Sequence, residues 1–261
     1  MTWATLQIAA RRLLANRRMA AGLLAGFILA VAAASSVPAF TAGALQRMLQ
    51  LELRAQPRLQ PASIQISHFE NPRRKTSLAH FLAADRVARE QGPALIGLPV
   101  HPFVRYGSLD MTHARPLDPS RLDPKVERWT AIAFLSDLQS HIALYDGRWP
   151  RDGLQGGGYE VIVEEAALDK LQLTVGAQLE VPVDKTPLAP TLAVTVVGAF
   201  RRADPMDPFW FHTTPYENQL FVTEATFTGE VLSNRRVVPG EHSWYFGLTA
   251  EDVKMTDLLR L

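Results

Sequence analysis

The tightest grouping of residues that could bind a metal ion is Asp204, Asp207 and His212, in the run Asp-Pro-Met-Asp-Pro-Phe-Trp-Phe-His. Carboxylate and imidazole groups are common metal ligands, but this spacing fits no recurrent pattern for zinc or calcium. Asp-Pro pairs favour tight turns instead. We therefore expect a rigid turn here, without a metal or any other cofactor.

Aromatic residues crowd the same stretch: Phe209, Trp210, Phe211 and Tyr216. Exposed aromatic side chains are common in the centre of protein interfaces, so this group could face a partner. Packing into a core is the more frequent fate of such side chains. The sequence therefore favours an aromatic plug that packs down on the rest of the fold.

Other catalytic patterns are absent from the sequence. It contains no G-x-x-x-x-G-K-[ST], no G-x-S-x-G and no H-E-x-x-H, and the triple glycine at residues 156–158 lacks dinucleotide-binding spacing and predicts a surface loop. Without any cysteine, the chain can form neither disulfides nor zinc–thiolate sites. The basic run Arg73-Arg74-Lys75 is typical of a solvated loop tip. These observations predict that the chain is not an enzyme and has no catalytic residues.

Charge is distributed unevenly along the chain. Residues 1–45 contain four arginines and no acidic residue, a charge of +4. Because the whole chain has 27 basic and 26 acidic residues, the remainder holds 23 basic and 26 acidic ones, a charge of −3. A basic end before a mildly acidic body is typical of a protein that meets a membrane. With no basic stripe in the body, nucleic acid is not expected as a partner.

Residues 19–45 form an uncharged, mostly apolar run. As a helix this run would be ~40 Å long, enough to cross a hydrocarbon core ~30 Å thick. Arg11, Arg12, Arg17 and Arg18 precede it and only Arg47 follows closely, so the positive-inside rule places the N-terminus in the cytoplasm. We predict a cytoplasmic amphipathic segment over residues 1–18, a transmembrane helix over 19–45 and a helical stalk over 46–56.

A cleaved signal peptide is the alternative interpretation of this segment. Ala42-Gly43-Ala44 matches a small-residue cleavage site, and the chain would then be secreted after Ala44. The apolar run is about twice as long as the usual 7–15 residues of a signal sequence. Apolar residues also recur at helical spacing beyond it until Pro57. Retention as an anchor is therefore the favoured interpretation.

The sequence pattern of residues 57–261 predicts an α+β domain. Alternating apolar and polar residues indicate strands at residues 63–67, 159–164, 178–183 and 192–200. Helices are expected from Ser77 to about Gly92-Pro93 and over residues 166–171. A last amphipathic helix is expected over residues 251–261, capped by Thr249, and its shortness predicts a domain that is incomplete at its C-terminus.

Several segments of this domain resemble the extracytoplasmic domain of FtsX-like and MacB-like ABC transporter permeases. That family places a G-R-x-P step before a strand, a short helix and a glycine turn. Here the step is Gly147-Arg148-Trp149-Pro150, and residues 160–168 and 173–179 follow it. Residues 194–200, Val-Thr-Val-Val-Gly-Ala-Phe, are similar to the family's next strand. The resemblance covers most of the chain from Leu13 on.

The resemblance implies a permease component in the bacterial cell membrane, with its main domain outside the cytoplasm. It implies a cytoplasmic ABC ATPase subunit as partner. The family has three further spans after the outer domain, which this sequence lacks, so we also expect separately encoded permease segments as partners. A single-span sensor or ligand-binding domain is the alternative function, and a protein secreted after cleavage near Ala44 is the third.

We predict that the N-terminal segment stays attached to the mature protein, because its uncharged run is long enough to anchor it. Alkaline carbonate extraction of membranes should leave the full-length chain in the pellet. A soluble form whose N-terminal residue is Leu45 would contradict this prediction.

Overall fold

The computed structural model describes residues 17–55, 63–69, 78–118, 123, 125–186, 188–211, 216–234, 237, 239–249 and 253–254. Its chain divides into two compact units, one of which includes α2 up to Glu52 while the other spans Leu53–Val253. His212, Arg73-Arg74-Lys75, most of the predicted 1–18 segment and Pro57 lie outside the described residues.

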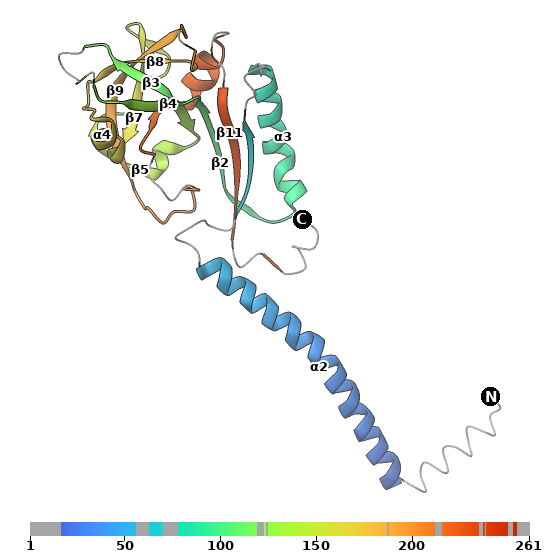
Figure 1. Ribbon diagram of the computed structural model, residues 1–261. Helices are drawn as coiled ribbons and strands as arrows, with labels where there is room; N and C mark the ends of the chain where they lie inside the picture. Colours follow the sequence, from blue (N-terminus) through green and yellow to red (C-terminus); the bar gives the residue numbers. More distant parts are fainter. Residues whose placement is uncertain are drawn as a thin grey trace. The chain divides into compact units, whose positions relative to one another are not determined.

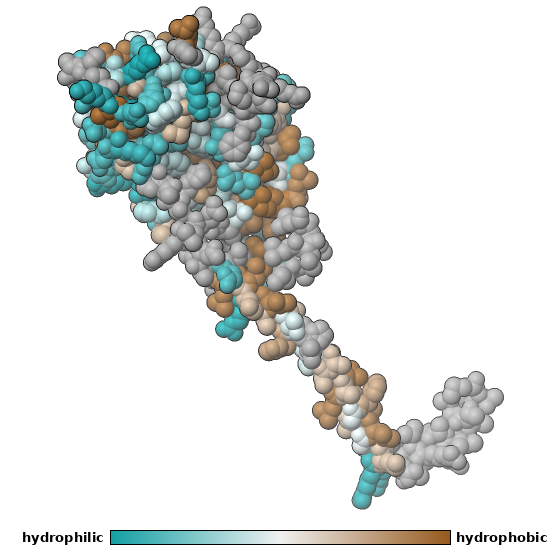
Figure 2. All heavy atoms as spheres, in the orientation of Figure 1, coloured by the Kyte–Doolittle hydropathy of each residue, from teal (hydrophilic) through white to brown (hydrophobic). Residues whose placement is uncertain are grey.

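Helix α2 (Arg17–Ala55) is continuous over 39 residues. Within the described residues it is the one helix long and apolar enough to cross a membrane, over Arg17–Glu52, by length and composition alone. Apolar side chains colour most of its described surface in Figure 2. The predicted span and stalk therefore form a single helix.

The second unit is built around one mixed sheet (Figure 1). Its elements, in chain order, are β1 (Ser63–Phe69), α3 (Leu78–Ile96), β2 (Val100–Leu109), β3 (Thr112–Pro116), β4 (Arg128–Leu135), η1 (Leu138–His141), β5 (Ile142–Gly147), β6 (Leu154–Gln155), β7 (Gly158–Glu164), α4 (Glu165–Leu171), β8 (Gln178–Pro182), β9 (Thr191–Arg202), β10 (Gln219–Phe221), α5 (Glu224–Thr226), η2 (Phe227–Val231) and β11 (Pro239–Leu248). Helix and sheet are largely segregated, in agreement with the predicted α+β class.

Six strands of the sheet close into a ring. Each strand in the order β3, β4, β10, β7, β9, β8 pairs with the next, and β8 pairs back with β3. Strands β2, β11 and β1 extend the sheet from β4 in that order. The ring leaves no free edge among its own strands, so every backbone polar group there has a ladder partner available.

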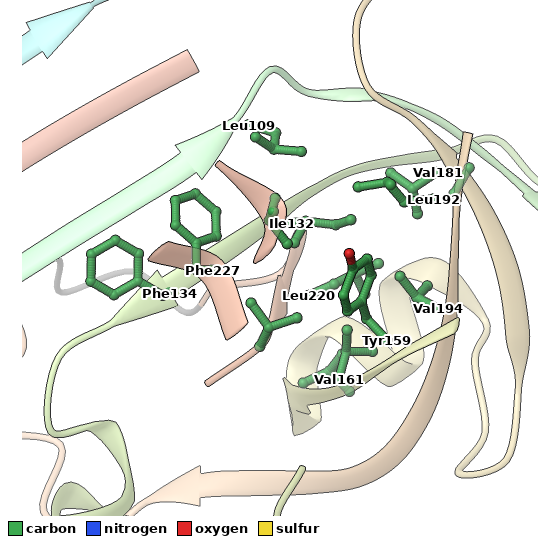
Figure 3. Close-up of a cluster of buried hydrophobic side chains, with 14 of the residues drawn as sticks. Leu109, Ile132, Phe134, Tyr159, Val161, Val181, Leu192, Val194, Leu220 and Phe227 are labelled. Atoms are coloured by element: carbon green, nitrogen blue, oxygen red, sulfur yellow. The ribbon is translucent and has the colours of Figure 1, made fainter. Parts of the chain in front are cut away.

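The inside of the ring is filled with apolar side chains. Figure 3 shows part of this cluster: the ring strands contribute Ile132, Phe134, Tyr159, Val161, Val181, Leu192, Val194 and Leu220, while Leu109 comes from β2 and Phe227 from η2. A second cluster, which includes Ile162, Phe200 and Phe221, lies on the other side of these strands. Strands β4, β7 and β10 therefore bury both of their faces.

Helix α3 packs beside β11 and buries Phe81, Asp85, Ala88 and Gly92, which recur at helical spacing (Figure 1). The predicted end near Gly92-Pro93 is wrong, because α3 continues to Ile96. A proline inside a helix removes one hydrogen bond and crowds the carbonyl four residues earlier, a cost that the packing of α3 offsets. The helix ends instead at Gly97, whose φ of +68° suits a C-terminal glycine and whose N–H donates to the Pro93 carbonyl at 3.0 Å.

The predicted C-terminal helix is wrong where the structure describes it. Val253 and Lys254 are not helical, and Val253 is buried against its surroundings. The remaining residues of that prediction, 251–252 and 255–261, lie outside the described residues. Burial of Val253 by tertiary packing has prevailed over a weak local helical pattern.

His242 on β11 is buried without a hydrogen-bond partner for either ring nitrogen within the described structure. Its ring lies 4.4 Å from that of Phe81, centroid to centroid. Burial lowers the His242 pKa from 6.5 to about 4; nearby His68 lowers it further, and Asp85 opposes the shift. His242 is therefore neutral in the folded protein at pH values where an unfolded chain would protonate it.

We predict that the free energy of unfolding falls by ~3 kcal/mol as pH drops from about 6.5 to 4, because only the unfolded state binds the proton in this window. Denaturant titrations of the full chain in detergent micelles measure the slope. The variant His242→Gln should lose this slope even if its stability is lower at every pH. His80→Gln, which changes an exposed histidine, should keep it, and an unchanged slope in His242→Gln would contradict the assignment.

Candidate functional site

The Gly147-Arg148-Trp149-Pro150 step lies where β5 ends, in direct backbone contact with β9. Gly147 has a φ of +72°, and the Arg148 N–H donates to the Val197 carbonyl at 2.9 Å. A Cβ atom on Gly147 would lie 2.2 Å from the Val197 oxygen, and one on Gly198 would lie 2.3 Å from the Arg148 oxygen. Both glycines are therefore required for this approach.

The Arg148 side chain ties the same turn to β7. Its guanidinium donates to both carboxylate oxygens of Glu160, at 2.6 and 2.5 Å, and the Arg151 N–H donates to Glu160 at 2.9 Å. The bidentate bond from Arg148 is the main cause that lowers the pKa of the buried Glu160 carboxyl to about 2; burial opposes it, and the Arg151 N–H assists. Glu160 is thus ionised at any physiological pH.

The turn, β7 and β9 together form what we call the GRWP interlock: residues 147–151, Glu160 and residues 197–198. These are three of the segments on which the family resemblance depends, and the fold brings them into one contact. The resemblance located the segments, but the pairing of Arg148 with Glu160 was not predicted. Its signal in the sequence was an acidic residue, Glu160, between the apolar residues Tyr159 and Val161 of a strand.

A second ion pair, buried at both partners, joins β7 to β9 on the same face of β7 as Glu160. The Arg202 Nε donates to Glu164 at 3.0 Å, and both side chains are less than a tenth exposed. Glu164 also accepts from the Tyr216 N–H at 2.5 Å. The Arg202 guanidinium lies 4.7 Å from the centre of the Trp210 ring, so that the charge is held by a carboxylate and an aromatic face together.

The predicted aromatic plug is present. Phe209, Trp210, Phe211 and Tyr216 are all 5% exposed or less and pack against the sheet in the second core cluster. These side chains serve the core and not a partner.

The described part of this stretch, Asp204–Phe211, folds as a turn, as the Asp-Pro pairs predict, and His212 lies outside the described residues. The Asp204 carboxylate accepts from the Met206 N–H at 2.8 Å, and Asp207 accepts from the Phe209 N–H at 2.9 Å. The other oxygen of Asp207 lies 2.7 Å from His141 Nδ1. In the part of the chain that the structure describes, no three His, Asp or Glu residues are placed to hold a metal ion.

A polar cluster around Asp85 was missed by the sequence analysis. Asp85 is 2% exposed and accepts from Trp244 Nε1 at 2.9 Å and from Arg105 at 3.3 Å. Arg105 also pairs with Glu224 at 2.5 Å, and Arg89 with Asp85 at 3.1 Å. The signal was an aspartate at a helical position that the apolar pattern assigns to the core.

The triple glycine lies in the hairpin between β6 and β7. Gly156 and Gly157 have φ values of +58° and +94°, and Gly158 begins β7. This agrees with the predicted loop.

These constellations hold strands together. Each carboxylate described in them accepts hydrogen bonds from an arginine, a tryptophan, a histidine or a backbone N–H. The arrangement is suited to fixing strand register.

No protein-family model matches the sequence, and no curated protein does. Among solved structures, the fold is similar to the periplasmic region of MacB from Actinobacillus actinomycetemcomitans, with 11% sequence identity and a TM-score of 0.38. The match covers 78% of this chain and 81% of that one.

We predict that Gly198→Ala lowers the free energy of unfolding by about 2 kcal/mol or more, because the new methyl group would overlap the Arg148 carbonyl. Gly229→Ala is the matched control, since a Cβ atom there meets nothing within 4 Å. Denaturant unfolding of the full chain measures both variants. Equal stabilities would show that the close approach is absent in solution.

We further predict that Glu160→Gln costs about 1–2 kcal/mol, since it weakens charge-assisted hydrogen bonds at a partly exposed arginine. Its destabilisation should be non-additive with that of Arg148→Gln in a double-mutant cycle. Additive effects would mean that the two side chains do not interact.

Proposed function

We propose that this chain is a membrane-anchored component of an FtsX-like or MacB-like ABC permease. Helix α2 would span the bacterial plasma membrane, with the N-terminus in the cytoplasm and the sheet domain outside. A cytoplasmic ABC ATPase would be its partner, together with permease segments encoded separately. The chain would transmit the state of the ATPase to the outer domain and would carry no catalytic group of its own.

The observation that carries this proposal is the GRWP interlock. Three short segments resemble the family, and up to about fifty residues separate them in sequence. Chance matches would have no reason to meet in space. Their union through the Gly198 contact and the Arg148–Glu160 pair supports a shared structural origin.

The continuity of α2 supports retention of the anchor. Ala44 lies inside an unbroken helix that runs on for a further eleven residues to Ala55. A span that continues as a helical stalk suits a protein in which movement is passed across the membrane, since a helix is stiffer than a loop.

The orientation is testable because the chain has no cysteine. In the proposed topology, the single variants Thr5→Cys and Leu188→Cys put a thiol on the cytoplasmic and the outer side of the membrane, respectively. The Leu188 side chain is 95% exposed. A membrane-impermeant maleimide added to intact cells should label only position 188. Labelling of position 5 alone would reverse the orientation.

The partnership with an ATPase needs a separate experiment. A photo-cross-linking amino acid at Gln7, on the cytoplasmic side of the proposed topology, should capture an ABC ATPase that mass spectrometry identifies. The same amino acid at position 188 is the control and should not. Absence of any ATPase at position 7 would favour the single-span sensor as the function.

A further inference from the structure

A hollow of about 240 Å³ lies on the outer face of the β3–β4 pair, beside the loop from β8 to β9. Strands β3, β4, β8 and β9 lie together in Figure 1. Its lining includes Trp129, His113, Arg115, Lys185, Thr186 and Thr191. None of these residues belongs to the GRWP interlock or to the ion pairs described above.

Trp129 gives the hollow an aromatic wall. It is 43% exposed, whereas the other residues of β4 are buried, and Trp210 and Trp244 are exposed by 2% and 5%. Its cross-strand partner is His113, whose ring centroid lies 4.1 Å away at an interplanar angle of 54°. Exposed indole in a concave site is a surface against which the C–H face of a ligand can pack.

Hydroxyl groups around the hollow are oriented as acceptors. Thr112 Oγ1 donates to the Pro182 carbonyl at 2.8 Å, and Thr186 Oγ1 donates to Asp184 at 2.5 Å. Thr112 is 2% exposed, so its oxygen is enclosed by the protein, whereas Thr186 and Thr191 are exposed and their oxygen lone pairs can accept from a ligand. A ligand with hydroxyl donors fits these groups.

Charge in the hollow favours an anion. Two cations, Arg115 and Lys185, line it against one carboxylate, Asp184, one oxygen of which accepts from the backbone N–H and the hydroxyl of Thr186. Guanidinium and ammonium groups bind carboxylates with charge-assisted hydrogen bonds. The volume is below the range of drug-sized sites, so it suits one ring.

We infer that this hollow binds a single acidic sugar ring, such as a uronic acid, either free or as the end of a glycan. The apolar face of the ring packs on Trp129, its carboxylate faces Arg115 and Lys185, and its hydroxyl groups donate to the threonine oxygens. The polyhydroxylated anion is the one ligand class that uses all three features of the lining.

Titration of the full chain in detergent micelles tests the inference, with calorimetry and tryptophan fluorescence as readouts. Glucuronate should bind about tenfold or more tightly than glucose, which lacks the charge, or acetate, which lacks the ring. A glucuronate-terminated oligosaccharide distinguishes the two sources: tighter binding than the monomer indicates a glycan end, and equal binding a free sugar acid.

Variants locate the site. Trp129→Ala should weaken glucuronate binding about tenfold or more, and Arg115→Gln should reduce the affinity to that for glucose. Lys125→Gln, an exposed cation outside the hollow, should change nothing. Trp129→Phe keeps an aromatic face and should retain part of the affinity, which guards against loss of folding.

Three results would overturn the inference: no binding at about 10 mM glucuronate, equal binding of acetate, or unchanged affinity in Trp129→Ala and Arg115→Gln. The titration requires no ATPase, so its failure would leave the proposed permease role standing.

Discussion

The close backbone contact between Arg148 and Gly198 is the constraint that holds β5 and its turn against β9, a strand of the ring. Strand β9 pairs with β7, β8 and β5, and the turn after β5 must pass directly over its backbone at Val197 and Gly198. A side chain at either glycine would separate β5 from β9. The sequence therefore has glycine at the two positions where the backbone of the turn and the backbone of β9 come closest.

Two carboxylate–arginine pairs fix the register of the strands that the two glycines allow to approach. Strand β7 is one of the ring strands and carries two buried carboxylates, Glu160 and Glu164, each paired with an arginine from another segment. Burying an ion pair contributes little net stability, because desolvation offsets the attraction. Leaving either carboxylate unpaired is costly, so a one-residue slip of β7 against its neighbours would be penalised. The pairs thus select one register.

Sequence patterns predicted the parts of the fold in which local signals are strong. The order of β7, α4, β8 and β9 followed from alternation, a short helical stretch and a glycine turn, and β1 from Ser-Ile-Gln-Ile-Ser. Strand β4 was missed because it buries both faces, so Arg-Trp-Thr-Ala-Ile-Ala-Phe-Leu shows no alternation. Strand β10 was missed because three residues are too few for a periodic signal. The closure of the ring depends on both, so it could not be predicted.

The candidate site was predictable in part for a similar reason. Motif resemblance located Gly147-Arg148-Trp149-Pro150 and residues 194–200, but pattern along the chain carries no information on which side chains meet across strands. Asp85 and the hollow beside Trp129 are products of tertiary packing in the same sense. In contrast, the Asp204–Asp207 turn and the aromatic plug are local features, and both were predicted.

The central claim is that a stiff helix links this outer domain to an ATPase across the membrane. Vanadate-sensitive ATP hydrolysis by the complex purified through the tagged full-length chain, in lipid nanodiscs, tests it most directly. The account predicts hydrolysis that co-purifies with the chain and whose rate changes severalfold when three glycines are inserted after Met48 in α2, because the insertion breaks the helical link. A purified chain without ATPase activity, or a rate that the insertion leaves unchanged, would contradict it.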